Sequence, residues 1–183
     1  MTIYYIKMFK AIEERRTCRQ FDPSRQIPRD VIERIARAGV NAPTGVDAQS
    51  FDLYFVSKKE ILDRIASEAV KNLPPVFSHG NVTPDRIFYH APTVCFIVPA
   101  REERADCVNY DLGIIADSLC IEAQLSGVSS AIIGLAGCCP ASVMKEVLGL
   151  PKEATAIGVC LGYASPEWKP QEKEIRSKVH WIE

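Results

Sequence analysis

The sequence predicts one α+β domain over residues 1–183, and three observations lead to this expectation. The length is enough to bury a real hydrophobic core without a division into domains. Apolar residues make up 47% of the chain and charged residues 25%, which is ordinary for a globular protein. Helical apolar spacing alternates with short apolar runs, and no repeat or linker divides the chain.

The helices are predicted from apolar spacing and from residues that begin or end helices. Pro28 is a favoured first-turn residue, and Gly39 ends the helix that Pro28 begins. Gly127 marks the end of the longest helical pattern, and Pro140 precedes the last one. In chain order, the predicted helices cover residues 6–15, 28–39, 58–71, 106–126 and 141–148.

The longest predicted helix, residues 106–126, carries apolar residues on more than one side. One stripe contains Leu112, Ile115 and Leu119, whereas Ile114 and Ile121 lie off it. Such a helix is buried on more than one side. It is either at a subunit interface or at the centre of a monomeric core.

Four apolar runs predict strands, and two other segments predict a surface loop and a docked C-terminus. Residues 93–98 form a continuous apolar run, which is typical of a buried strand. Residues 72–85 contain three prolines and predict an irregular, lid-like surface segment. The apolar ending at residues 179–182 predicts a docked segment, an edge strand. The four strands are predicted at residues 53–56, 93–98, 128–133 and 155–161.

A dense cluster of basic residues follows the first predicted helix. Arg15, Arg16 and Arg19 lie within five residues, with Thr17 between them. Guanidinium groups form bidentate hydrogen bonds with phosphate, and a threonine hydroxyl adds a neutral donor. The cluster therefore suits a compact dianion, although a solvated charge run is the common alternative.

Two segments carry a family resemblance. Arg15-Arg16-Thr17-Cys18-Arg19-Gln20-Phe21 and Ala42-Pro43-Thr44-Gly45-Val46-Asp47-Ala48-Gln49 resemble the N-terminal signatures of the nitroreductase family, the FMN-dependent NAD(P)H oxidoreductases. Members typically read Arg-Arg-Ser-x-Arg-x-Phe and Ala-Pro-Ser-Gly-x-Asn-x-Gln, so Asp47 departs from the pattern. Residues 125–134, 148–151 and 159–163 also resemble family segments, which extends the likeness from Ala11 to Tyr163.

The resemblance implies a nitroreductase-like central mixed sheet flanked by helices, with a long central helix at a homodimer interface and FMN bound there. It implies that the loop of residues 43–49 is donated by the other subunit, with Asp47 doubtful as a site residue. It implies neither a dedicated catalytic side chain nor a metal. The implied FMN-binding residues are Arg15, Arg16, Thr17, Arg19, Pro43, Thr44, Gly45, Gln49, Ile132, Ile133, Gly134, Lys173 and Arg176.

The implied activity is ping-pong hydride transfer from NADH or NADPH through FMN N5 to a small acceptor: a nitroaromatic, a quinone, a flavin or an enone. Two alternatives stay open. A relative of the same fold could destroy flavin or remove halogens, and the departure at Asp47 leaves room for this. The seven cysteines also leave room for a non-catalytic FMN-binding or thiol redox sensor.

The composition and the absence of certain motifs argue against several other classes of function. A net charge of −1 argues against nucleic-acid or acidic-membrane binding. The sequence has no evident signal peptide, no membrane-length apolar run and no Gly-x-Gly-x-x-Gly. His79, His90 and His180 lack metal-ligand spacing, and Cys138-Cys139 reads as two small buried residues. An odd number of cysteines predicts reduced thiols and a cytoplasmic protein.

Overall fold

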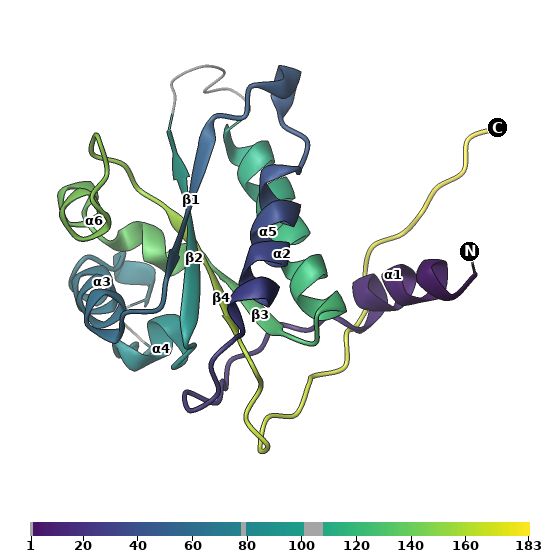
Figure 1. Cartoon of the computed structure of the whole chain (residues 1–183), viewed down its shortest axis with the longest axis horizontal. Helices are drawn as coiled ribbons and strands as arrows, with labels where there is room; N and C mark the ends of the chain where they lie inside the picture. The colour runs from purple at the N-terminus through teal and green to yellow at the C-terminus, as the bar shows by residue number, and fades with distance from the viewer. Residues whose placement is uncertain (1, 78–79, 101–107) are drawn as a thin grey trace.

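The computed structural model describes residues 2–77, 80–100 and 108–183 (Figure 1). The strands are β1 (Phe51–Val56), β2 (Thr93–Pro99), β3 (Ser129–Ile133) and β4 (Ile157–Gly162). The α-helices are α1 (Thr2–Glu14), α2 (Arg29–Val40), α3 (Lys59–Lys71), α4 (Asp85–Phe88), α5 (Val108–Leu125) and α6 (Ala141–Leu148). Short 3₁₀ turns are η1 (Gly45–Asp47), η2 (Pro75–Phe77) and η3 (Gly134–Cys138).

The strands form one sheet in the order β1–β2–β4–β3, with every neighbouring pair antiparallel. The α+β class is therefore confirmed, but the sheet itself is not mixed. Helix α5 connects β2 to β3, and these two strands run in the same direction. However, β4 is inserted between them and pairs antiparallel with both. The parallel pairing in the described part is an isolated bridge between Thr17 and Ser130.

Helices cover both faces of the sheet (Figure 1). Helices α3, α4 and α6 lie on one face, and α2 and α5 lie on the other. Side chains along β2 alternate between the two cores that result: Phe96 packs on the α3 side, and Ile97 packs on the α5 side. Both are fully buried, which explains why the sequence of this strand is apolar throughout.

The predicted elements correspond to the observed ones, with small shifts at their ends. Helix α5 is confirmed as the longest, with 18 residues. Its predicted first two residues, 106 and 107, lie outside the described residues. Apart from η2 and the start of α4, the predicted irregular segment of residues 72–85 carries no helix or strand where it is described. Whether that segment acts as a lid stays a prediction.

Several large apolar side chains on the outside of this chain have no cover. Tyr110, Ile114 and Leu125 on α5 are 74%, 39% and 40% exposed. Together with Ile121 they have the spacing i, i+4, i+11 and i+15, so they share one face of the helix. Helix α1 projects from the body (Figure 1), and its Phe9 is 55% exposed.

The predicted docked edge strand at the C-terminus is wrong for this chain. After β4 the chain leaves the sheet, passes α1 and ends away from the body (Figure 1). No strand is assigned to residues 163–183, and Trp181 and Ile182 are 85% and 97% exposed. Within one chain the tail reaches no strand edge with which it could pair, so its apolar residues face solvent.

Candidate functional site

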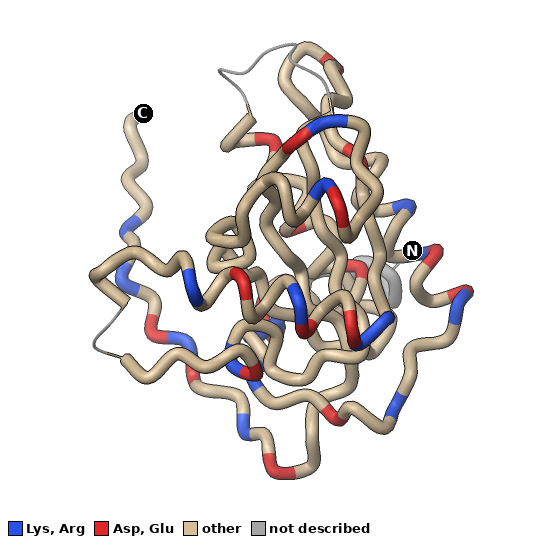
Figure 2. The backbone as a smooth tube through the Cα atoms, turned by 90° about the vertical axis from the view of Figure 1, so that its left-hand side faces the viewer, with Lys and Arg blue, Asp and Glu red and all other residues tan. Residues whose placement is uncertain are grey.

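The arginine cluster faces the start of the C-terminal tail across a cleft of about 580 Å³. The cleft holds five cationic side chains and one carboxylate, together with a hydroxyl and two amides. Basic and acidic residues elsewhere are interspersed along the chain (Figure 2), so this concentration of positive charge is local. The lining residues are Arg15, Arg16, Thr17, Arg19, Gln20, Trp168, Lys169, Gln171, Glu172 and Lys173.

The arginines reach this cleft because the chain after α1 runs extended across the ends of β3 and β4. The Cys18 amide donates to the Ser130 carbonyl at 2.9 Å, and Phe21 forms an antiparallel bridge with Ala164. Cys18 and Phe21 are buried, which anchors the segment to the core. The basic side chains between and before these anchors are left on the outer side, facing the cleft.

Arg16 ties the arginine cluster to the tail. Its Nε donates to the Gln171 carbonyl at 3.1 Å, across 155 residues of sequence. Its Nη1 donates to the carbonyls of Glu13 and Arg15 at 2.6 and 2.9 Å. These carbonyls lie at the C-terminal end of α1, where main-chain oxygens lack helical partners. Arg16 therefore caps a helix and holds the tail at the same time.

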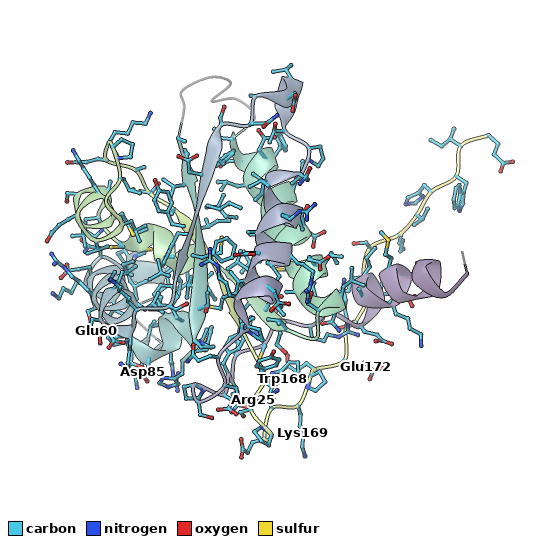
Figure 3. The ribbon with its side chains drawn as sticks, viewed as in Figure 1. Arg25, Glu60, Asp85, Trp168, Lys169 and Glu172 are labelled. Atoms are coloured by element: carbon cyan, nitrogen blue, oxygen red, sulfur yellow. The ribbon has the colours of Figure 1, made fainter. Side chains whose placement is uncertain are left out.

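The tail contributes Lys169 and Lys173 to the cleft, whereas Arg176 lies outside it. The Arg176 side chain is 82% exposed and donates to Glu174 at 2.6 Å. That hydrogen bond raises the pKa of Arg176 above its ordinary value. Figure 3 shows Trp168 and Lys169 where the tail turns below the sheet, and Glu172 farther along, toward α1.

The second group of predicted site residues lies far from this cleft within the chain. Pro43, Thr44, Gly45 and Gln49 belong to the loop that precedes β1, at the opposite end of α5 (Figure 1). The Gly45 amide donates to Asp111 in the first turn of α5, whereas Gln124 in the last turn lines a small groove with Glu14 of α1. Thirteen residues of helix separate these two points, about 20 Å.

The loop is held in an uncommon backbone shape. Val46, Asp47 and Gln49 have φ of 50°, 55° and 47°, in the left-handed region that non-glycine residues rarely adopt. The Gln49 amide donates to Thr44 Oγ1 at 3.0 Å, and Gln49 Nε2 donates to Asp47 Oδ1 at 2.9 Å. Asp47, the residue that departs from the family pattern, thus accepts a hydrogen bond from its own loop.

The third predicted group lies on and just after β3. Ile132 is 45% exposed, on the strand that begins beside Thr17. Ile133 is buried in the core on the α3 side, so only its main chain could face a ligand. Gly134 is exposed and begins η3.

Sequence reasoning missed several residues that the fold brings to these places. Gln171 meets Arg16 through its main chain, so its residue type carries no signal. Trp168 and Glu172 come from a tail with no periodic pattern. Asp111 did carry a signal, because it is a carboxylate one turn before Ile115 on the buried stripe of α5.

Other kinds of site have less support in the described part of the chain. No group of three His, Cys, Asp or Glu side chains gathers there as a metal site. Six cysteines are described; all are free thiols and five are buried. Burial raises the pKa of Cys139 to about 11, and that of Cys160 well above its usual range. None of the described helices is both long and apolar enough to span a membrane.

Solved structures of other proteins share this fold over almost the whole chain. A nitroreductase with bound FMN from Desulfitobacterium hafniense DCB-2 is 22% identical, with a TM-score of 0.82 and coverage of 97% of this chain and 98% of that one. A nitroreductase with bound FMN from Bacteroides fragilis NCTC 9343 is 24% identical, with a TM-score of 0.80 and coverage of 96% and 97%.

The FMN-dependent nitroreductase NfnB from Mycobacterium smegmatis, in complex with NADPH, is 17% identical, with a TM-score of 0.74 and coverage of 98% and 100%. At these identities the likeness establishes the fold. No curated protein matches the chain. The model of the Nitroreductase family matches residues 12–163, which is most of the sequence, and the protein therefore belongs to the Nitroreductase family.

Proposed function

We propose that this chain is an FMN-dependent oxidoreductase that takes electrons from NADH or NADPH and reduces a small organic acceptor. Family membership supports the oxidoreductase class. FMN bound to the relatives from Desulfitobacterium hafniense and Bacteroides fragilis, and NADPH in complex with NfnB, support the cofactor and the donor. The observation that carries the proposal is the cationic cleft between the arginine cluster and the tail.

The donor set of this cleft fits the phosphate of FMN. A phosphate monoester carries nearly two negative charges at neutral pH and three strong acceptor oxygens. Arg15, Arg19 and Lys173 present charged donors, and Thr17 adds a half-buried hydroxyl. We assign Arg15, Thr17 and Lys173 to the phosphate and the adjoining part of the cofactor, and Arg19 to the edge of the ring. Lys169 is a fifth candidate, and it replaces Arg176 in our assignment because Arg176 lies outside the cleft.

Arg16 has a different role in this proposal. Three of its hydrogen bonds go to main-chain carbonyls, and one of these carbonyls belongs to the tail. By holding Gln171, it keeps Lys169 and Lys173 beside the other cationic groups. We therefore propose that Arg16 orders the cleft, and that its charge also lowers the cost of bringing a dianion there.

When bound, FMN supplies a ring that accepts a hydride from the nicotinamide and then passes reducing equivalents to the acceptor, which is the basis for ping-pong kinetics. Ile132 offers a half-exposed apolar surface on the strand next to Thr17, and we propose that it packs against that ring together with the main chain of Ile133 and Gly134. Positive charge near the ring, from Arg19, favours its reduced, anionic form. We assign no side chain as a dedicated acid or base. Nitroaromatics, quinones, free flavin and enones are the acceptor classes that we propose.

We further propose that the chain is a single domain that forms a homodimer with the cofactor at the interface. The 43–49 loop contacts α5 at Asp111, about 20 Å along the helix from Gln124, whose groove contains Glu14, the residue before the cleft residue Arg15. In a dimer, that loop of one protomer can meet the cleft of the other. The exposed apolar stripe of α5, the apolar residues of α1 and the apolar tail supply surface for such contact. We also propose a cytoplasmic location, on the odd number of cysteines.

The first test is the visible absorption spectrum of the purified protein, taken before and after addition of FMN and then without oxygen after addition of NADH or NADPH. We expect a flavin spectrum that bleaches with one of the two donors, and multiple turnovers once menadione or a nitroaromatic compound is added. A protein that stays colourless and does not take up FMN contradicts the proposal. A flavin that binds but is not reduced favours the non-catalytic alternative instead.

Five of the six described thiols do not fit the thiol-sensor alternative, because they are buried, whereas Cys138 is half-buried. A sensor thiol is exposed and has a lowered pKa. Here burial raises the pKa of Cys18, Cys95, Cys120, Cys139 and Cys160. Both the burial of these five thiols and the direction of their pKa shifts argue against a sensor role for them.

A further inference from the structure

We propose that Asp111 is a positioning residue whose buried carboxylate holds the 43–49 loop in the shape in which it meets the flavin of the second protomer. The inference rests on the proposed function for the flavin, but the contact itself lies within one chain. It joins α5 to a loop that is 66 residues away in the sequence.

The first observation is the burial of Asp111. It is 4% exposed, and it is the only Asp, Glu, Lys or Arg among the buried residues that the structure describes. Aspartate is almost never this buried unless its carboxylate has a partner. Here Asp111 Oδ1 accepts a hydrogen bond from the Gly45 amide at 2.9 Å. A position in the first turn of α5 also suits a negative group, because the N-terminal end of a helix carries partial positive charge.

The second observation is the backbone of the loop that Asp111 touches. Three non-glycine residues within four positions adopt left-handed φ, and one of them, Val46, is β-branched. Such a backbone persists only where its surroundings hold it, and it is concentrated at functional sites. The hydrogen bonds of Gln49 to Thr44 and Asp47 stay inside the loop. The bond from Gly45 to Asp111 ties this shape to a rigid helix.

The third observation is the space below the loop. A cavity of about 160 Å³ lies between the loop and the helices, lined in part by Thr44, Gln49 and Ile115. Ile115 is one turn after Asp111 on the same face of α5. The loop therefore does not rest on a filled core at this point. It has room to relax if the bond from Gly45 is lost, and Pro43 and Val46 on its outer surface would move with it.

To hold the loop through the Gly45 amide, the side chain at position 111 must be short and must carry a strong hydrogen-bond acceptor. A carboxylate accepts a stronger hydrogen bond than an amide oxygen. Asparagine has the same shape and keeps an oxygen that can accept from Gly45, so Asp111→Asn preserves the bond in weakened form. Leucine branches at the same side-chain carbon but is larger and has no acceptor, so Asp111→Leu removes the partner of the Gly45 amide.

The test compares Asp111→Leu and Asp111→Asn with Asp63→Leu and Asp63→Asn, which change an exposed aspartate on α3, on the other face of the sheet. The first measurement is hydrogen exchange at the Gly45 amide in protein without FMN. We expect exchange at least about tenfold faster in Asp111→Leu, from loss of a hydrogen bond to a charged group. We expect an intermediate rate in Asp111→Asn and no change in the Asp63 variants.

The second measurement is the visible spectrum and the dissociation constant of added FMN. In Asp111→Leu we expect a shifted flavin absorption band and FMN binding weakened about tenfold, both largely restored in Asp111→Asn.

Unchanged exchange at Gly45 in Asp111→Leu, or equal loss of Gly45 protection and FMN binding in the Leu and Asn variants, overturns the positioning role. If the wild-type protein takes up no FMN, the proposed function fails and the flavin part of this inference fails with it. The exchange data then still decide whether Asp111 holds the loop. Should Asp111→Leu not fold, the loss of Gly45 protection in Asp111→Asn, measured against Asp63→Asn, decides the matter.

Discussion

Neighbouring arginines in this protein have different surroundings and hence different roles. Arg16 uses its donors on the main chain of α1 and of the tail. Arg15 is half-buried beside it and lines the same cleft. A positive group that is already ordered and partly shielded from water attracts a dianion more strongly than a freely mobile surface charge does.

Arg15 and Arg176 provide a matched pair for the phosphate assignment. Arg15→Ala should weaken FMN binding by about ten- to a hundredfold, because it removes charge-assisted hydrogen bonds. Arg176→Ala should leave the affinity within about twofold, because an exposed ion pair contributes little. Titration of flavin fluorescence measures both, and circular dichroism checks folding. Equal losses in the two variants would place the phosphate outside the cleft described above.

For single residues, the sequence indicates which residues are candidates for the site better than it indicates which way their side chains face. The arginine cluster could be singled out because its density is unusual, and four of its members do line one cleft. Lys173 and Arg176 are three residues apart in a tail without regular structure, where no periodicity says which one faces inward. The role of Asp111 depends on a contact with Gly45 that is set by the packing of the loop on α5, which no local pattern encodes.

The helices and strands were predictable because their apolar spacing matches the faces that they bury. On β2, residues of one parity face α3 and residues of the other face α5, so the whole run is apolar. Strand order was not predictable in the same way. The insertion of β4 between β2 and β3 depends on long-range pairing, and the tail had an apolar pattern but no partner within its own chain.

Gly162, at the end of β4, lies where Pro92 and Phe21 pack closely against the strand. A Cβ there would lie 2.6 Å from Cδ of Pro92 and 2.9 Å from Cδ1 of Phe21, and the proline ring cannot rotate away. Gly162→Ala should therefore lower the free energy of unfolding by about 1–3 kcal/mol.

The control is Gly137→Ala, where the new Cβ would meet its nearest neighbour, the Ala156 carbonyl oxygen, at 3.5 Å. An effect within about 0.5 kcal/mol is expected there. Urea denaturation followed by circular dichroism measures both variants. A neutral Gly162→Ala would mean that Pro92 and Phe21 pack more loosely against β4 than the structure indicates.

At the scale of the whole molecule, many of the exposed large apolar side chains lie on α1, α5 and the tail. We expect the protein to sediment at twice the chain mass of 20.3 kDa. Ile114→Glu, on the exposed stripe of α5, should raise the dissociation constant of the dimer at least tenfold, by about 1.4 kcal/mol or more, since it buries a charge in the interface.

Val76→Glu is the matched control for the dimer. Val76 is 75% exposed on η2, which follows α3 on the opposite face of the sheet. It should leave the association unchanged. Analytical ultracentrifugation over a range of concentrations measures all three proteins. A wild-type monomer, or a dimer that tolerates Ile114→Glu, would exclude the α5 stripe as the interface.

The insertion of β4 also has a consequence for how the chain is made. β1 and β2 can pair as soon as both have left the ribosome, but β3 finds its neighbour only when residues 157–162 have been synthesised. Until then, the apolar strand β3 and one edge of β2 stay open, and exposed edges of this kind promote aggregation. Nascent chains that stop before β4 should therefore depend on chaperones, whereas chains extended beyond Gly162 can close the sheet.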